Sequence, residues 1–484
     1  PDSIDAIFKT LHDTAIIHQT GGGTGFSFSR LRPSGDPVRR TEGVSSGPVS
    51  FMKIFDAATE EIKQGGKRRG ANMGILRVDH PDIKEFITVK ADESQLRNFN
   101  ISVGITDAFM MAVKRGTRYP LIHPRTNKRV GTYDARTIFK LIAASAWKSA
   151  DPGVVFLDTI NKTQPTPKLG QIESTNPCGE VPLLPYEACN LGSVNLANFV
   201  TDGEIDYERL ADVVHDAVHF LDNVIDMSRY PLPQIVTMVH GNRKIGLGVM
   251  GFADLLVKVG IPYDSKEGLA LGERIMRFVD TEAKKASVAL AKERGVFPNF
   301  KESIYDTGKK TDRVRNATRT SIAPTGTIAI ITGCSSGIEP LFSLAYTHTI
   351  LEKKQLIDVN TDLVRVAKQR GFYSSAFLCK LQETGDIKHI AGVPADLKRV
   401  FVTALEVSPD YHVRMQAVFQ QHTDNAVSKT VNLPIDATVK DVERIYKMAY
   451  ELGCKGISVY RYGSKANQIL VTGAVCRTCG TDEA

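Results

Sequence analysis

Short apolar segments alternate with amphipathic helical patterns along most of this 484-residue chain. Apolar residues recur at helical spacing over 4–15, 207–227, 265–294 and 439–452, whereas 73–78, 154–160 and 456–460 are short apolar runs. Such alternation predicts an α/β architecture rather than separate all-α and all-β domains. Because 42% of the residues are hydrophobic, the chain can bury a large core.

The distribution of charged, apolar and cysteine residues limits which ligands and which cellular location fit this chain. The net charge of +7 is spread along the chain, which suits small anionic ligands and argues against nucleic acid. No apolar run is long enough to cross a bilayer, and no secretory signal pattern is present. Seven irregularly spaced cysteines do not form the framework of a secreted disulfide-rich protein. We therefore expect a cytoplasmic protein that binds neither nucleic acid nor a membrane.

The densest chemical cluster is Asn176-Pro177-Cys178-Gly179-Glu180. In an extended segment, Asn176, Cys178 and Glu180 would share one face, placing a thiol between an amide and a carboxylate that can act as a base. Pro177 and Gly179 suit a tight loop that pushes the thiol into a cavity. A lone cysteine is more often structural, but the polar flanks favour a reactive thiol. Eleven residues later stands Cys189, either a disulfide partner or a cysteine with a separate role.

Four segments that contain glycine carry weaker functional signals. In 323–328, two threonines around Gly326 at a predicted helix start can cradle a phosphate, although an ordinary turn is the more frequent structure for such a pattern. The runs 21–25 and 64–70 predict loops. The pattern Gly246-x-Gly248-x-x-Gly251 matches a dinucleotide fingerprint, but the polar stretch 240–244 precedes it where a strand is required. We expect these glycines to allow close helix packing instead.

The run from Asn176 through Cys189 to Leu196 resembles the active-site segment of ribonucleotide reductases, specifically the adenosylcobalamin (vitamin B12)-dependent class II enzymes. The resemblance extends over residues 1–465 and leaves a short cysteine-bearing tail at 466–484. It implies a ten-stranded α/β barrel made of two antiparallel halves, each of five parallel strands. A central finger loop would carry Cys178.

The resemblance also implies roles for the cluster. Cys178 would become a thiyl radical that removes the 3′ hydrogen of the ribose, while Glu180 takes the 3′-hydroxyl proton and Asn176 holds the ribose hydroxyls. Cys189 would be one of two cysteines that end as a disulfide, and the sulfur radical would need a dry, enclosed site. The implied substrate contacts are Gly23, Asn176, Pro177, Cys178, Gly179, Glu180, Pro324, Thr325, Gly326, Thr327 and Ile328.

Allosteric control by a deoxynucleotide is a further implication. Asp2, Ser3 and Ile4 resemble the segment that holds the effector's sugar and base, and Arg32 and Arg39 its phosphate contacts. Without the resemblance, these arginines fit a solvated surface equally well. The loop that would link the effector and substrate sites comprises Arg68, Arg69, Gly70, Ala71 and Asn72.

The terminal CxxC, Cys476 and Cys479, fits either a redox tail served by a thioredoxin-like or glutaredoxin-like reductant or half of a zinc site, and no complete metal site is predicted. The family's second reducing cysteine and its helical N-terminal region would precede Pro1, so we expect a longer natural protein. A homodimer is compatible with the resemblance.

The radical source is indicated by Tyr460-Arg461-Tyr462. Members that use a separate metal-bearing subunit carry two adjacent tyrosines near this point, whereas here an arginine separates the rings. The pattern favours adenosylcobalamin, which supplies the radical directly. Two alternatives stay open, a class I-type large subunit and a catalytically silent regulatory paralogue. The choice between diphosphate and triphosphate substrates also stays open.

Overall fold

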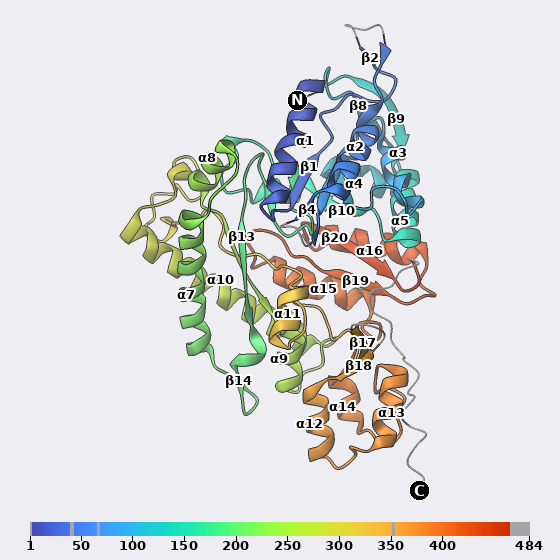
Figure 1. Cartoon of the computed structure of the whole chain (residues 1–484), viewed down its shortest axis with the longest axis vertical. Helices are drawn as coiled ribbons and strands as arrows, with labels where there is room; N and C mark the ends of the chain where they lie inside the picture. The colour runs from blue at the N-terminus through green and yellow to red at the C-terminus, as the bar shows by residue number, and fades with distance from the viewer. Residues whose placement is uncertain (1, 39–42, 65–67, 351–353, 465–484) are drawn as a thin grey trace.

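The computed structural model describes residues 2–38, 43–64, 68–350 and 354–464 (Figure 1). Its largest sheet has the order β1-β6-β7-β10-β20-β19. The first four strands run parallel to one another, β20 is antiparallel to β10, and β19 is parallel to β20. These strands are β1 (Thr24–Ser27), β6 (Asn72–Arg77), β7 (Phe99–Ile105), β10 (Gly153–Phe156), β19 (Thr430–Leu433) and β20 (Gly456–Arg461).

A second set of strands continues from β19. β13 (Asn190–Asn195) and β16 (Ile245–Met250) are parallel, and single parallel bridges join Leu247 to Thr320 and Ile322 to Val427, just before β19. The segments 190–195, 245–250, 320–322, 427–433 and 456–461 thus run parallel to one another and antiparallel to the first four strands. The α/β class with two opposed parallel sets is confirmed.

The predicted closure into ten strands is not reached by the strand pairs within the described ranges. The first set has four paired strands there, because the next segment, β11 (Ser174–Thr175), pairs antiparallel with β12 (Pro182–Leu183). This short hairpin still lies directly against β1, since a Cβ on Gly25 would overlap the Thr175 carbonyl. The closed barrel stays a prediction.

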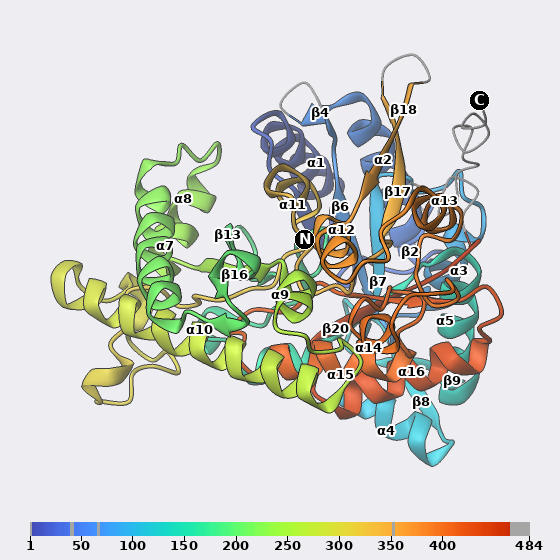
Figure 2. The same cartoon turned by 90° about the horizontal axis from the view of Figure 1, so that it is seen from below.

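Helices cover the two sets on opposite sides of the molecule. α5 (Ala135–Ser149) and α16 (Val439–Glu451) pack together beside the first set, where Ile142 and Tyr446 are fully buried. α7 (Tyr207–Met227) and α10 (Lys266–Arg294) pack together beside β13 and β16. Figures 1 and 2 agree in placing α7 and α8 (Pro233–Asn242) on one side and α5 and α16 on the other.

A small helical group lies at one end of the molecule (Figure 1). It consists of α12 (Thr361–Gln369), α13 (Ser375–Thr384) and α14 (Ala395–Val400), and its own apolar core includes Leu363 and Leu381. In the described ranges, no helix is both long and apolar enough to cross a membrane. The remaining helices are α1 (Ile4–Gln19), α2 (Gly47–Glu61), α3 (Ile83–Thr88), α4 (Asp107–Arg115), α6 (Leu157–Lys162), α9 (Phe252–Lys258), α11 (Gly326–Thr332) and α15 (Pro409–Gln420).

Short hairpins complete the fold: β2 (Pro37–Val38) with β3 (Gly43–Val44), β4 (Lys63–Gln64) with β5 (Arg68–Arg69), β8 (Arg118–Ile122) with β9 (Arg129–Asp134), β14 (Val200–Thr201) with β15 (Glu204–Ile205), and β17 (Ala345–Ile350) with β18 (Lys354–Val359).

Two local predictions need correction. The strand expected at 154–160 ends at Phe156, and α6 begins at Leu157, so the apolar Leu157 and Ile160 are buried from a helix rather than a strand. The glycines of the GxGxxG pattern do not pack helices together. Gly246 and Gly248 lie on β16, where an added Cβ would collide with Ser321 on the neighbouring segment. Close approach of two strands is the physical reason for both glycines.

Candidate active site

Cys178 lies at the tip of the turn between β11 and β12. The Gly179 N–H donates to the Asn176 carbonyl over 3.1 Å, and the Asn176 N–H donates to Val181 over the same distance. Gly179 has a φ of +86°, which glycine adopts without strain. The segment is therefore a tight turn, as its Pro and Gly predicted. The segment is not extended, so the condition under which Asn176, Cys178 and Glu180 would share one face is not met.

The predicted burial of the thiol is wrong. Cys178 is exposed to solvent because the turn projects it outward. Protein atoms nevertheless surround the sulfur densely enough that desolvation, helped by the negative charge of Glu180, raises the pKa of the thiol to about 12. Cys178 thus keeps its proton at neutral pH.

Glu180 is the buried partner of this thiol, with 2% of its surface exposed. Burial raises the pKa of its carboxyl, and a hydrogen bond from the Asn176 side chain partly offsets that effect. Among the described residues, its Oε2 atom has no hydrogen-bond partner. A buried carboxyl with one unused oxygen and a raised pKa is suited to accept a proton from a bound molecule.

Residues on or next to the four parallel strands β1, β6, β7 and β10 contact one side of the turn. A Cβ on Gly23 would stand 2.9 Å from Pro177 Cγ, so the glycine run before β1 lies against the turn. The Asn100 side chain, on β7, donates to the Pro177 carbonyl over 2.8 Å. The sequence prediction did not include Asn100, although a polar residue within the apolar run 99–105 was an available signal.

Residues of the second strand set hold the other side. The Glu180 carbonyl accepts hydrogen bonds from the Ser321 hydroxyl and the Ala426 N–H, both at 2.9 Å. A Cβ on Gly246 would stand 2.8 Å from Ser321 Cβ and 3.5 Å from Cys189 Sγ. The structure therefore brings Cys189 to the same region as the Glu180 turn.

Cys189 and Cys178 are both free thiols. Cys189 Sγ donates to the Asn190 carbonyl at 3.3 Å. Burial raises the pKa of Cys189 strongly, and the Glu180 carboxylate raises the pKa of both thiols. One carboxylate thus interacts electrostatically with the two cysteines that the sequence singled out.

The predicted phosphate segment starts two residues after Ser321. Thr325 is buried with a φ of +56°, and its Oγ1 accepts from the Gly337 N–H over 2.7 Å. α11 begins at the next residue, so 326–328 form its first turn. Pro324, Gly326, Thr327 and Ile328 are exposed. The Ser321–Glu180 bond places the start of this segment beside the turn that carries Cys178.

The predicted effector residues meet at the start of α1. Arg32 donates to the Asp2 carboxylate at 2.7 Å and to its carbonyl at 3.3 Å. Ser3 caps α1, and Ile4 is 60% exposed. Arg125, which the sequence argument missed, approaches Asp2 to 3.8 Å. The predicted residue Arg39 lies outside the described residues.

The predicted linking loop lies between α1 and the glycine run. The backbone of Arg68 and Arg69 forms β5. A Cβ on Gly70 would stand 2.8 Å from His18 Nδ1 of α1. The Ala71 carbonyl accepts from the Thr24 N–H at 3.3 Å, and Asn72 Oδ1 accepts from the Thr24 hydroxyl at 2.5 Å. This loop therefore contacts both α1 and the residue that follows Gly23. Cys476 and Cys479 lie outside the described residues.

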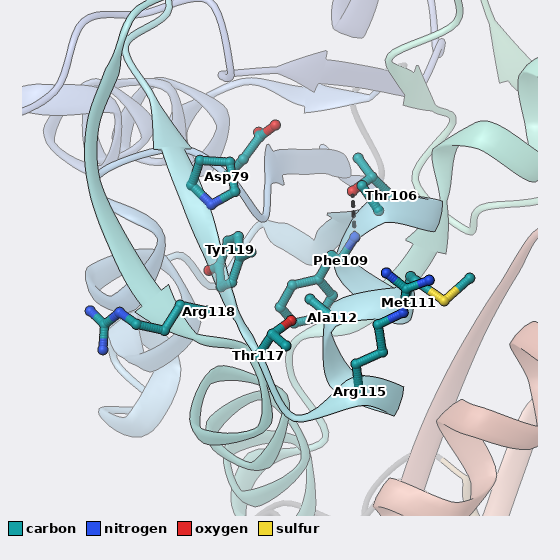
Figure 3. A pocket seen from close by; sticks show the side chains of 11 residues that line it. Asp79, Thr106, Phe109, Met111, Ala112, Arg115, Thr117, Arg118 and Tyr119 are labelled. Atoms are coloured by element: carbon teal, nitrogen blue, oxygen red, sulfur yellow. Dashed lines mark hydrogen bonds between the residues drawn. The ribbon is translucent and has the colours of Figure 1, made fainter.

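A separate cavity of about 260 Å³ lies between α4 and β8 (Figure 3). Its walls include Phe109, Arg115 and Arg118, and the Tyr119 hydroxyl donates to the Val78 carbonyl. None of its lining residues is among the predicted site residues, so this cavity is not the candidate active site.

Comparison with known proteins assigns a family. The family model described as "Ribonucleotide reductase, barrel domain" matches residues 1–460. The chain is 53% identical to a vitamin B12-dependent ribonucleoside-diphosphate reductase of Thermoplasma acidophilum, with 98% of the chain and 61% of that protein aligned. It is 50% identical to a protein of the same name from Mycobacterium tuberculosis strain CDC 1551, with 98% of the chain and 68% of that protein aligned. The chain thus spans roughly two thirds of the length of these relatives.

A solved structure shares the fold. The alpha subunit of the Actinobacillus ureae class Id ribonucleotide reductase matches with a TM-score of 0.77 at 23% identity, covering 96% of this chain and 82% of that one. The match over 1–460 and the relatives at 50% identity or more point to the same family. The chain belongs to the ribonucleotide reductase family and contains its barrel domain.

Proposed function

We propose that the protein containing this chain reduces ribonucleotides to deoxyribonucleotides through a thiyl radical on Cys178. The observation that carries this proposal is the turn that presents the Cys178 thiol beside the buried Glu180 carboxyl, with Cys189 close behind it. The names of the relatives, ribonucleoside-diphosphate reductases, favour a diphosphate substrate.

In this proposal, Cys178, Glu180 and Asn176 each act in a separate step of the reaction. Cys178, once it has lost its hydrogen atom, takes the 3′ hydrogen of the ribose. Glu180 accepts the 3′-hydroxyl proton at its unpaired Oε2, and Asn176 orients the ribose hydroxyls. The 2′-hydroxyl leaves as water, and Cys189 with a second cysteine supplies two electrons and becomes a disulfide. Cys178 finally returns a hydrogen atom to the 3′ carbon.

The state of Cys178 fits adenosylcobalamin as the radical source. Its raised pKa keeps the sulfur as a thiol, the form that holds a hydrogen atom, and its place at the turn tip exposes it to an approaching cofactor. When bound, adenosylcobalamin supplies a carbon-centred radical by cleavage of its cobalt–carbon bond. Pro177, Cys178 and Gly179 are the residues that would face it, and the vitamin B12-dependent relatives support this choice.

The proposal extends to binding and regulation. Residues 323–328 would hold the substrate phosphates, and Asp2, Ser3, Ile4 and Arg32 a deoxynucleotide effector. Residues 68–72 would couple the two sites, because they contact both α1 and Thr24. In the whole protein we expect a closed ten-stranded barrel, a homodimer, a thioredoxin-like or glutaredoxin-like reductant and a cytoplasmic location.

The decisive experiment uses the full-length protein with a ribonucleoside diphosphate, a dithiol and adenosylcobalamin, without a second subunit. We expect deoxynucleotide to form, and we expect Cys178→Ser to abolish turnover while nucleotide binding, measured by calorimetry, is kept. Turnover that requires a metal-bearing subunit would instead establish the class I-type alternative. Nucleotide binding without turnover in either condition would establish a silent regulatory paralogue.

A further inference from the structure

A buried ion pair joins Glu187, two residues before Cys189, to Lys244. The Lys244 ammonium donates to Glu187 Oε2 over 2.7 Å, and both side chains are 1% exposed. The Leu184 N–H donates to the same carboxylate oxygen at 2.6 Å, and the Asn242 side chain donates to the other. The pair is therefore well satisfied, and none of the proposed reaction steps uses it.

Strand register puts Lys244 on the same face as Cys189. β13 and β16 are parallel, with Asn190 opposite Ile245, so Cys189 and Lys244 precede this pair at the same level. Opposed residues of parallel strands point to the same side, and so do residues two apart on one strand. The contact of Cys189 Sγ with the position of Gly246, two residues after Lys244, agrees with this placement.

The charges around Cys189 act in opposite directions. Lys244 lowers the pKa of the Cys189 thiol, whereas burial, Glu187 and Glu180 raise it, and burial has the largest effect. Two further groups lie in this region. Tyr230 interacts with Cys189, and Lys455, whose own pKa burial lowers to about 8, interacts with Lys244. Lys244 is thus the group that favours a negative sulfur at a site that otherwise disfavours it.

We propose that Lys244 is a positioning residue for the reducing cysteine: its buried ammonium, held by Glu187, stabilises the thiolate that Cys189 becomes when its disulfide is cleaved. The inference rests on the proposed function. It explains why the chain buries an ion pair here, since burying two charges carries a desolvation penalty that apolar side chains would avoid.

The chemistry of the step is disulfide exchange. A thiolate of the external dithiol attacks the sulfur of the second cysteine and forms a new S–S bond to it. The bond to Cys189 breaks, and its electron pair stays on the Cys189 sulfur as a thiolate beside Lys244. This thiolate is then protonated from solvent. The other thiol of the reductant displaces the second cysteine, so the external dithiol is oxidised and both cysteines are reduced. A more stable departing thiolate leaves faster.

The test measures the thiol itself and needs no turnover. In the reduced full-length protein, the rate of alkylation of Cys189 by iodoacetamide is followed against pH by peptide mass spectrometry. We expect Lys244→Met to slow alkylation about tenfold at pH 8 and to move the rate profile to higher pH, because the thiolate loses its stabilising charge. We expect Glu187→Gln to accelerate alkylation severalfold, because it removes a negative charge but keeps one acceptor oxygen for the Leu184 N–H.

The opposite signs separate this role from a structural one. If the pair only supported packing, both variants would loosen the site and both would speed alkylation; that result, or no change in either, would overturn the proposal. Lys244→Arg, which keeps the charge, should stay within about threefold of the unsubstituted rate. Should Lys244→Met fail to fold, the double variant Lys244→Met/Glu187→Met replaces the pair by apolar side chains and should react more slowly than Glu187→Gln.

The same experiment distinguishes failure of this inference from failure of the proposed function. A full-length protein without reductase turnover that still shows opposite shifts at Cys189 would refute the function and keep the electrostatic role. An active reductase whose Cys189 alkylation rate does not change in these variants would refute the electrostatic role of Lys244 and keep the proposed function.

Discussion

Gly23 and Pro177 touch across 154 positions of sequence: a Cβ on Gly23 would stand only 2.9 Å from Pro177 Cγ. Gly23 precedes β1, and Pro177 immediately precedes Cys178. The glycine run therefore fixes how closely the turn that carries the thiol approaches β1. A side chain at Gly23 would push this turn away.

Gly23→Ala should displace the turn. Because a shift of about 1 Å at a reacting group can cost on the order of 100-fold in rate, we expect kcat of the full-length enzyme to fall by about 10- to 100-fold. Overpacking of this kind should lower the free energy of unfolding by only about 1 kcal/mol. Gly131→Ala is the matched control, since its added Cβ would meet Leu121 at an ordinary 3.6 Å. Equal kcat values in the two variants would contradict the role of Gly23.

Cys178 should react slowly with iodoacetamide despite its exposure. With a pKa of about 12, only about one thiol in 10,000 is ionised at pH 8, and thiolate is the reacting form. We expect the alkylation rate to rise continuously from pH 7 to pH 10. Glu180→Gln removes the neighbouring negative charge and should increase the rate at pH 8. A rate that levels off below pH 9 would be inconsistent with the environment described.

Glu180→Gln should also stabilise the protein while it inactivates it. Burial raises the pKa of Glu180 above its unfolded value, so this residue contributes stability at low pH that is lost as pH rises through the folded pKa. Glutamine has no charge to desolvate, and we expect a gain of about 1 kcal/mol at pH 7.5, a common size for a stabilising substitution. The gain should shrink toward pH 4, where Glu180 is itself protonated. Thermal unfolding at several pH values measures the difference.

Thr325→Val and Thr325→Ser form a matched pair for the phosphate segment. Valine keeps the shape but removes the oxygen that accepts the Gly337 N–H, whereas serine keeps it. Loss of this hydrogen bond should let the segment move, and we expect KM for the ribonucleotide to rise about tenfold in Thr325→Val, equivalent to about 1.4 kcal/mol. Thr325→Ser should stay near the unsubstituted KM. An unchanged KM in both variants would remove this segment from substrate binding.

Periodicity predicted much of the fold. The helices expected at 207–227 and 265–294 match α7 and α10, because long amphipathic patterns leave little ambiguity. The switch from β10 to α6 at Leu157 was not predictable, since a short apolar run fits a buried strand and a buried helix equally well. Gly246 was misread for a similar reason: its close neighbour, Ser321, is distant in the chain.

The residues of the candidate site can be read from the sequence, whereas their geometry cannot. Asn176, Cys178 and Glu180 stand together in the sequence, so their chemistry could be inferred locally. Their geometry depends on contacts with Asn100, Ser321 and Ala426, which lie at least 76 positions away. No local pattern contains such contacts. Pro177 and Gly179 therefore predict the tight turn, whereas the exposure of its thiol cannot be predicted from them.

The anchoring of the Cys178 turn has a consequence for how the chain can be divided. Gly23 and Asn100 come from the four-stranded set, whereas Ser321 and Ala426 come from the set that runs the other way. Neither half alone contains both supports. Fragments split between α6 and β11 and expressed separately should therefore each lack a functional thiol–carboxyl pair. Complementation would require the two sets of strands to pair again in register, β10 with β20.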